Sequence, residues 1–136
     1  MVKLKVSERE HKQRVEEVRR RLEGHGLDLL LLLSKPRIFY LTGLPYIEGS
    51  RVFVLGVPRD GELFLIVPKL EEDHVKLFRR HWIKDVIVYW EYPHGEKPAH
   101  EAIRRAIEER GLSSGVIGVD QMVLTPVPNL DDITLN

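Results

Sequence analysis

The amino-acid sequence predicts an α/β domain in which a mixed β-sheet lies between layers of helices. Helix and strand patterns alternate along the chain, as is typical of layered α/β folds. One predicted strand is a leucine run of the kind found in strands that are covered on both faces. Two other strands are joined by a short hairpin turn, so antiparallel strands must lie beside parallel, helix-connected ones. Together these observations predict a three-layer fold.

The first predicted elements are a helix and a buried strand. Ser7 and Glu10 form a capping-box pattern, and apolar residues then recur at helical spacing, which predicts a helix over residues 7–25. Residues 27–33 suit a central strand better than a helix because the run is short, although leucine is a weak strand former. Because side chains alternate along a strand, two sets of leucines should face opposite helix layers. These sets are Leu29, Leu31 and Leu33 on one face and Leu30 and Leu32 on the other.

A hairpin follows a short turn or helix at residues 35–43. Strand patterns cover residues 51–57 and 62–67, and Asp60-Gly61 between them is a hairpin turn signal. The two strands are therefore expected to be antiparallel neighbours.

The second half of the chain continues the alternation of helices and strands. The predicted elements are a helix over residues 70–80, a strand over 86–89, a loop over 92–98, a helix over 99–110 and a strand over 116–119. Prolines interrupt the tail over residues 125–136, where a last strand is possible near Ile133.

Composition limits the size and the partners of the protein. With 136 residues and 43% hydrophobic residues, the chain is expected to form one domain over residues 1–136. The 21 basic and 21 acidic side chains balance, so no overall field attracts nucleic acid or an anionic membrane. Cysteine is absent, no signal-peptide pattern is present and residues 29–33 are too short to span a bilayer. We therefore expect a cytoplasmic protein without nucleic-acid or membrane partners.

Histidines and carboxylates form no recognisable catalytic pattern. None of the six histidines lies in an H-E-x-x-H motif, and His74 and His81 are expected to be solvated on a helix face. Asp28 and Asp120 lie near strand termini, but one precedes its strand and the other follows, so they are not expected to converge on Mg²⁺ as in a nuclease. The sequence predicts no catalytic residue and no metal ligand.

Two short basic or glycine-rich stretches also have ordinary explanations. Gly24-His25-Gly26 follows a helix and precedes a strand, the reverse of a phosphate-binding loop, and is expected to end the helix. The run Arg19-Arg20-Arg21 is interleaved with glutamates at pairing distance, which favours a solvated helix face over a nucleic-acid footprint.

Several segments resemble one known family in their order and spacing. Residues 35–44, K-P-R-I-F-Y-L-T-G-L, resemble the N-I-R-Y-L-T-G-F segment of the amino-terminal domain of the creatinase, prolidase and aminopeptidase P family. Residues 14–32, R-V-E-E-V-R-R-R-L-E-G-H-G-L-D-L-L-L-L, are similar to the segment that precedes it. The resemblance continues through L-I-V-P-K-L-E at residues 65–71 and V-I-G-V-D at residues 116–120.

The resemblance implies a fold and a division of labour between domains. It implies a mixed sheet flanked by helices, similar in outline to ribonuclease H. The family's peptidases hold two divalent metal ions, such as Mn, Co or Zn, through two Asp, one His and two Glu of a later catalytic domain, which this chain lacks. The resemblance therefore implies a non-catalytic domain of a metal-dependent Xaa-Pro peptidase, which forms a homodimer and acts on peptide substrates.

The remaining candidate site is the loop after residue 43. Tyr46, Glu48 and Arg51 place an aromatic ring, a carboxylate and a guanidinium on a segment that has the composition of a binding loop. The resemblance implies that this part of the domain faces the active site of the other subunit and helps to bind substrate. The alternative is an ordinary polar loop in which Tyr46 packs against the sheet.

Two other classes of function remain as alternatives. The first is a freestanding α/β binding or dimerisation module that shares only its architecture with the peptidase domain. The second, a small nuclease or nucleotide-binding protein, is disfavoured because the sequence has neither a carboxylate cluster nor a phosphate loop.

Overall fold

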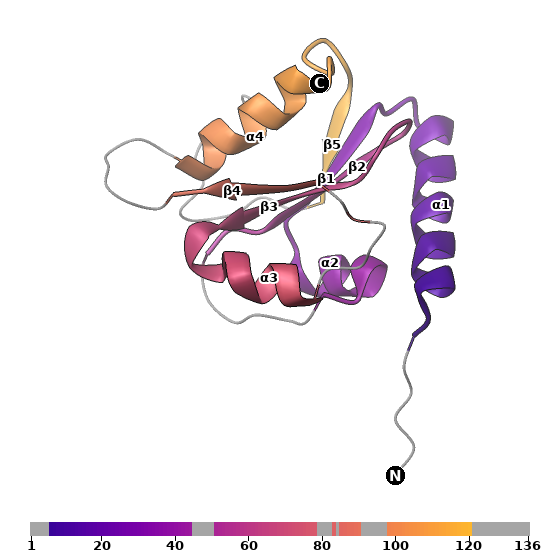
Figure 1. Ribbon diagram of the computed structural model, residues 1–136. Coiled ribbons are helices and arrows are strands. Elements are labelled where there is room, and N and C mark those ends of the chain that lie inside the picture. Colours follow the sequence, from indigo (N-terminus) through magenta and orange to yellow (C-terminus); the bar gives the residue numbers. More distant parts are fainter. Residues whose placement is uncertain (1–5, 45–50, 79–82, 84, 91–97, 121–136) are drawn as a thin grey trace.

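A computed structural model describes residues 6–44, 51–78, 83, 85–90 and 98–120 (Figure 1). Its helical elements are α1 (Glu8–Gly24), α2 (Lys35–Thr42), the 3₁₀ turn η1 (Lys69–Glu71), α3 (Glu72–Phe78) and α4 (Pro98–Glu109). Its strands are β1 (Leu29–Leu32), β2 (Val54–Pro58), β3 (Phe64–Pro68), β4 (Asp85–Tyr89) and β5 (Ile117–Val119). They form one sheet in the order β4-β3-β2-β1-β5.

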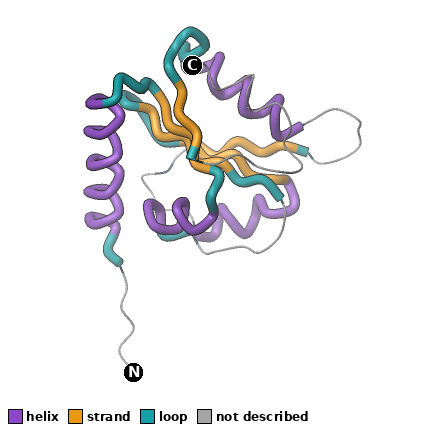
Figure 2. Tube along the Cα trace, turned by 180° about the vertical axis from the view of Figure 1, so that it is seen from behind, coloured by secondary structure: helices purple, strands orange, loops and turns teal. Residues whose placement is uncertain are grey.

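The sheet is mixed, and helices cover both of its faces. Strand β2 is antiparallel to β1 and β3, whereas β1 pairs with β5 and β3 with β4 in parallel. Helices α1, α2 and α3 lie on one side of the sheet and α4 lies on the other (Figures 1 and 2). The three-layer α/β fold predicted from the sequence is therefore confirmed.

The leucines of β1 alternate between the two layers as predicted. Leu29, Leu31 and Leu33 belong to the core cluster under α4, which also contains Ile103 of that helix. Leu32 is buried in the opposite cluster, and Leu30 packs against it. Strand β1 is therefore covered on both faces, and this explains why residues 29–33 are apolar without interruption.

One glycine of β2 makes room for an aromatic ring in the core beneath α4. A Cβ atom at Gly56 would lie 2.0 Å from Cζ of Phe64, its partner on β3. The guanidinium of Arg110 lies 4.1 Å from the centroid of the same ring and forms an ion pair with Asp85 of β4. The burial of Arg110 lowers the pKa of its guanidinium. This stack connects β2, β3, β4 and the end of α4.

The predicted ends of the first helix have clear physical causes. The Ser7 hydroxyl accepts a hydrogen bond from the Glu10 backbone N–H at 3.1 Å, which caps the helix. At the other end, Gly26 has a φ of 69°, and Leu27 donates to the Leu22 carbonyl at 2.8 Å. This Schellman motif ends the helix, so the segment at residues 24–26 is the predicted helix stop.

Several predicted boundaries shift in the structure. The strand predicted over residues 51–57 begins only at Val54, and its hairpin partner extends to Pro68. Pro98 belongs to α4 instead of the preceding loop, because proline is tolerated in the first turn of a helix. The expected strand near Ile133 and most of the predicted loop over residues 92–98 lie outside the described residues.

Candidate functional site

Four strands end, and one begins, at the same end of the sheet. The pairing directions place the carboxyl ends of β1, β3, β4 and β5 beside the amino end of β2. Open α/β sheets bind their ligands outside the carboxyl ends of their strands. We refer to this end, which contains the start of α2, residues 51–53, η1, Trp90 and Asp120, as the carboxyl end of the sheet.

Arg51 is the only one of the three predicted loop residues that the structure describes. Its guanidinium Nη1 lies 3.9 Å from Oε1 of Glu71, and its side chain is 43% exposed. Tyr46 and Glu48 lie outside the described residues. Arg51 therefore lies at the carboxyl end of the sheet, directly before β2.

Glu71 is surrounded by basic side chains from three segments. Besides Arg51, the ring of His74 places Nδ1 at 3.7 Å from Oε2 of Glu71. Burial lowers the pKa of Lys35, while Glu71 raises and Arg51 lowers it. The Lys35 ammonium also lies 5.4 Å from the ring centroid of Phe53. Among the described residues, basic side chains from α2, α3 and the segment before β2 therefore interact with the Glu71 carboxylate.

An exposed tryptophan extends the same end of the sheet. Trp90 directly follows β4 and is 64% exposed. The ammonium of Lys69, the residue after β3, lies 5.1 Å from the centroid of its ring. Lys69 also forms an ion pair with Glu72, as does Lys76 at 2.6 Å. These hydrogen bonds lower the pKa of Glu72 to about 2.

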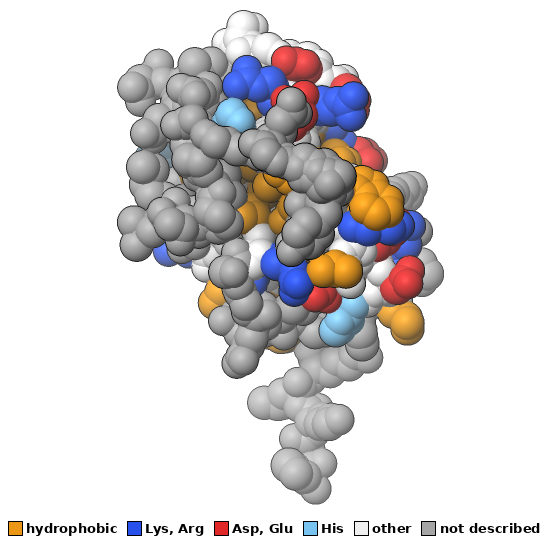
Figure 3. All heavy atoms as spheres, turned by 90° about the vertical axis from the view of Figure 1, so that its left-hand side faces the viewer, with side chains coloured by type: hydrophobic (Ala, Val, Ile, Leu, Met, Phe, Trp, Pro, Cys, Tyr) orange, Lys and Arg blue, Asp and Glu red, His pale blue; other side chains and the backbone are white. Residues whose placement is uncertain are grey.

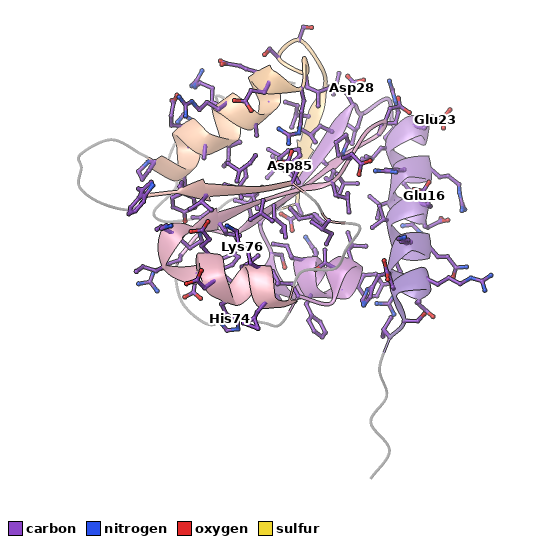
Figure 4. All side chains as sticks on the ribbon, in the orientation of Figure 1. Glu16, Glu23, Asp28, His74, Lys76 and Asp85 are labelled. Atoms are coloured by element: carbon purple, nitrogen blue, oxygen red, sulfur yellow. The ribbon has the colours of Figure 1, made fainter. Side chains whose placement is uncertain are left out.

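Figure 3 shows this side of the molecule, which lies at the left of Figure 1. Basic, acidic and hydrophobic side chains lie next to one another on the described part of this face. Figure 4 places His74 and Lys76 on α3, on the side of the sheet opposite α4. The described part of this surface therefore combines hydrophobic side chains with charged side chains of both signs.

Sequence reasoning missed most of the residues that surround Arg51. Lys35, Lys69, Glu71 and Trp90 come from three separate segments that only the sheet brings together. One available signal was their position, since each follows a predicted strand by a few residues. If the strands had been known to be parallel, these residues could have been placed at one end of the sheet. The order of the strands, which determines which of these residues are neighbours, could not be predicted from the sequence.

The two aspartates near strand termini hold the backbone at opposite ends of the sheet. Asp120 accepts hydrogen bonds from the backbone N–H groups of Leu33 at 2.8 Å and Ser34 at 3.1 Å. Asp28 accepts from Val116 N–H at 2.8 Å, next to β5 at the other end. The predicted lack of convergence is confirmed, and both carboxylates connect segments of the fold.

The described histidines do not assemble a metal centre. His74 is 47% exposed, in agreement with a solvated helix position, whereas His11 is buried and lies 3.2 Å from the Tyr40 carbonyl oxygen. His81 lies outside the described residues. Within the described ranges, no three His, Cys, Asp or Glu side chains come close enough together to hold a metal ion.

The basic run on α1 is neutralised on its own helix. Arg19 pairs with Glu16 at 2.9 Å, and Arg20 pairs with Glu17 at 2.6 Å. Arg19 also donates from Nε to the Pro58 carbonyl at 3.2 Å, so it holds the hairpin in place. None of the helices in the described part of the chain has the length and apolar character of a membrane span.

Comparison with solved structures identifies relatives of the same fold. The N-terminal domain of Xaa-Pro dipeptidase from Lactobacillus brevis superposes with a TM-score of 0.70 at 21% identity, covering 87% of this chain and 83% of that one. The prolidase from Thermococcus sibiricus gives a TM-score of 0.69 at 22% identity, with coverage of 90% and 31%. No curated protein matches the sequence significantly.

A similarity of higher identity covers only the first part of a longer protein. The dipeptidase from Pyrococcus horikoshii OT3 is 30% identical, with a TM-score of 0.62 over 80% of this chain, which spans 28% of that protein. The family model of the creatinase/prolidase N-terminal domain matches residues 14–129. Because this match includes every described strand and the larger part of α1, the chain belongs to the creatinase/prolidase N-terminal domain family.

Proposed function

We propose that this chain is the non-catalytic amino-terminal domain of a metal-dependent Xaa-Pro peptidase, in which it shapes the substrate site and contributes to dimerisation. The family match over residues 14–129 carries this proposal. Two of the similar proteins, a dipeptidase and a prolidase, are more than three times as long as the part that matches this chain. The chemistry would then belong to a domain beyond Asn136, and the whole protein would act in the cytoplasm.

In this proposal the two parts of the protein have different tasks. Two divalent metal ions, Mn²⁺, Co²⁺ or Zn²⁺, would be held by the catalytic domain and would activate the nucleophile there. The described residues of this chain offer no group of three potential ligands for them. The contribution of this domain would be binding and orientation of the peptide.

Arg51 is the side chain best placed for substrate binding. It lies at the carboxyl end of the sheet, and a guanidinium can bind a peptide carboxylate through two parallel hydrogen bonds. Glu71 lies 3.9 Å from the guanidinium, beyond hydrogen-bond length, and attracts it electrostatically. Tyr46 and Glu48 would contribute to the site, and Trp90, at the same end of the sheet, would offer an apolar surface.

The competing function is a freestanding α/β binding or dimerisation module. It has the same fold and the same carboxyl end, but no catalytic domain follows it. The reading frame after Asn136 distinguishes the two, because only the peptidase requires downstream Asp, Asp, His, Glu and Glu ligands.

Activity measurements on two proteins test the proposal. This chain alone should not hydrolyse Xaa-Pro dipeptides or longer proline peptides in the presence of Mn²⁺, Co²⁺ or Zn²⁺. The longer protein in which this chain is joined to its downstream catalytic domain, called the joined protein below, should hydrolyse them and should lose the activity with a chelator. Chelator-sensitive turnover that copurifies with the 136-residue chain, or a joined protein inactive with all three metals, contradicts the proposal.

A further inference from the structure

Strand β4 lies at one edge of the sheet, and among the described residues its only strand neighbour is β3. It runs between the layer of α3 and the layer of α4 (Figure 1). Strands β2 and β3 are buried along their whole length, whereas the first four residues of β4 are only partly buried. Solvent therefore reaches successive side chains of this strand on both faces of the sheet.

The composition of β4 lacks the usual protection of an edge strand. Natural edge strands are commonly very short or carry lysine or proline, which discourages pairing with another strand. Strand β5, at the opposite edge, has only three residues and is therefore protected by its short length. Strand β4 has five residues, D-V-I-V-Y, without lysine or proline. Its single charge, Asp85, forms an ion pair with Arg110 of the same chain.

Apolar side chains line both faces of this edge. Val86 and Val88 pack against the core cluster on the side of α1, α2 and α3, and Ile87 packs against the cluster under α4. Trp90 continues the alternation of Val86 and Val88 and is 64% exposed. Exposed apolar groups next to open backbone edges are typical of strand-addition sites.

We propose that β4 is a self-association edge, at which two copies of the chain pair their β4 strands antiparallel with Ile87 on the twofold axis. Two identical strands around such an axis form an isologous interface. With this register, Ile87 faces its own copy, Val86 faces Val88, and Asp85 faces Tyr89. Apolar groups then meet apolar groups on both faces, and the carboxylates are kept apart.

Other antiparallel registers fit the strand less well. A shift of one residue would pair side chains from opposite faces, because side chains alternate along the strand. Placing Val86 on the axis would leave Val88 and Tyr89 without partners inside the strand. The register centred on Ile87 is the one that uses all five residues of β4 and preserves both apolar layers.

The size of this edge indicates how strong the association should be. Two five-residue strands bury less than the roughly 1,000 Å² that a stable interface requires. The chain alone is therefore expected to dimerise weakly and in a concentration-dependent way. The proposal deepens the dimerisation part of the proposed function and rests on it, because the joined protein would add further contacts.

The absence of cysteine makes site-specific cross-linking a direct test. Opposed residues of antiparallel strands lie about 4.5–5.5 Å apart at Cα, within the range that a disulfide spans. Ile87→Cys should therefore form a disulfide-linked dimer under mild oxidation. Val116→Cys, which is partly exposed next to the opposite edge, serves as the matched control and should remain monomeric. Thermal melting of both variants establishes that they are folded.

A mixing experiment tests the register. Val86→Cys and Val88→Cys chains should cross-link with each other when mixed and much less with themselves, because only positions 86 and 88 face one another. The joined protein, purified with each cysteine, should give the same pattern.

The outcomes separate this proposal from the proposed function. Cross-linking of Ile87→Cys that does not exceed that of Val116→Cys overturns the β4 interface, even if sedimentation shows the joined protein to be a dimer. A joined protein that stays monomeric at every concentration refutes dimerisation as well. Self-linking of Val86→Cys as strong as linking to Val88→Cys overturns the register.

Discussion

Two groups of charged side chains, one at each end of the sheet, contact different kinds of partner. At the amino end of β1, Asp28 accepts from the Val116 N–H, and Arg19 donates to the Pro58 and Gly61 carbonyls. At the carboxyl end, Arg51 and His74 approach the Glu71 carboxylate at 3.9 and 3.7 Å. The first set connects backbone segments, whereas these contacts with Glu71 join side chains at longer distances.

This difference suggests which residues serve the fold and which serve a partner. A charge that holds backbone groups cannot change partner without loosening the fold, because buried N–H groups left unpaired are costly. Side chains that meet beyond hydrogen-bond length give up little when a ligand or another domain replaces one of them. Substitutions in the core and at the charges that hold the backbone should therefore cost stability, whereas substitutions at Arg51 and its loop should affect the substrate.

The largest effect is expected in the interior of the sheet. Leu31 is fully buried between its partners Gly56 on β2 and Val119 on β5. Leu31→Asp should unfold the domain, since an unpaired buried charge costs at least several kcal/mol against a total stability of about 5–15 kcal/mol. Circular dichroism melting provides the measurement, with Leu77→Asp at a 77% exposed position as the control. A cooperative, native-like transition in Leu31→Asp would contradict the buried position.

A smaller loss is expected when Gly56 gains a methyl group. The new Cβ would lie 2.0 Å from the Phe64 ring, so the ring must move within a filled core. Gly56→Ala should cost about 1–3 kcal/mol in urea unfolding. Gly24→Ala, in a helix with nothing within 4 Å of the added Cβ, should be neutral or stabilising. Trimming the ring with Phe64→Leu should recover part of the loss, and the absence of any recovery would refute the steric explanation.

The aspartates at the two ends of the sheet provide a more moderate comparison. Asp120→Ala leaves the N–H groups of Leu33 and Ser34 without their acceptor and should cost about 1–3 kcal/mol. Asp28→Ala should cost less, because one backbone donor is involved and the carboxylate is more exposed. Asp60→Ala, at a highly exposed carboxylate, is the control for the loss of a charge. An order reversed between Asp120 and Asp28 would show that these hydrogen bonds do not set the stability.

A weak pH dependence is expected from Glu72. The ammonium groups of Lys69 and Lys76 lower the pKa of its carboxyl from 4.5 to about 2. Because the folded-state pKa is below the unfolded one, the pair stabilises the fold above pH 4.5 and loses this contribution as the pH falls toward 2. An NMR titration of the Glu72 carboxyl should give a midpoint well below 4.5, and Glu72→Gln should flatten the loss of stability in that window. A carboxyl that titrates near 4.5 would contradict the pairing.

The layers of the fold were predictable from the sequence because they depend on local patterns. Alternating leucines, the Ser7 cap and the Asp60-Gly61 turn each act within a few residues, and the structure confirms all three. The carboxyl end was less predictable, because Arg51, Glu71 and Trp90 are brought together only by the strand order. The start of β2 at Val54 also escaped prediction. Val52 and Phe53 continue the apolar pattern of the strand but have no strand partner among the described residues.

The central claim is that Arg51 and its loop serve the substrate and do not serve the fold. In the protein joined to its catalytic domain, the test is to measure kcat/KM beside thermal stability for Tyr46→Ala, Glu48→Ala and Arg51→Ala. We expect melting changes within about 0.5 kcal/mol for each variant. For Arg51→Ala we expect a loss of transition-state stabilisation, calculated from kcat/KM, of up to about 2–5 kcal/mol. Unchanged kinetics in all three variants, or activity lost only in parallel with stability, would contradict it.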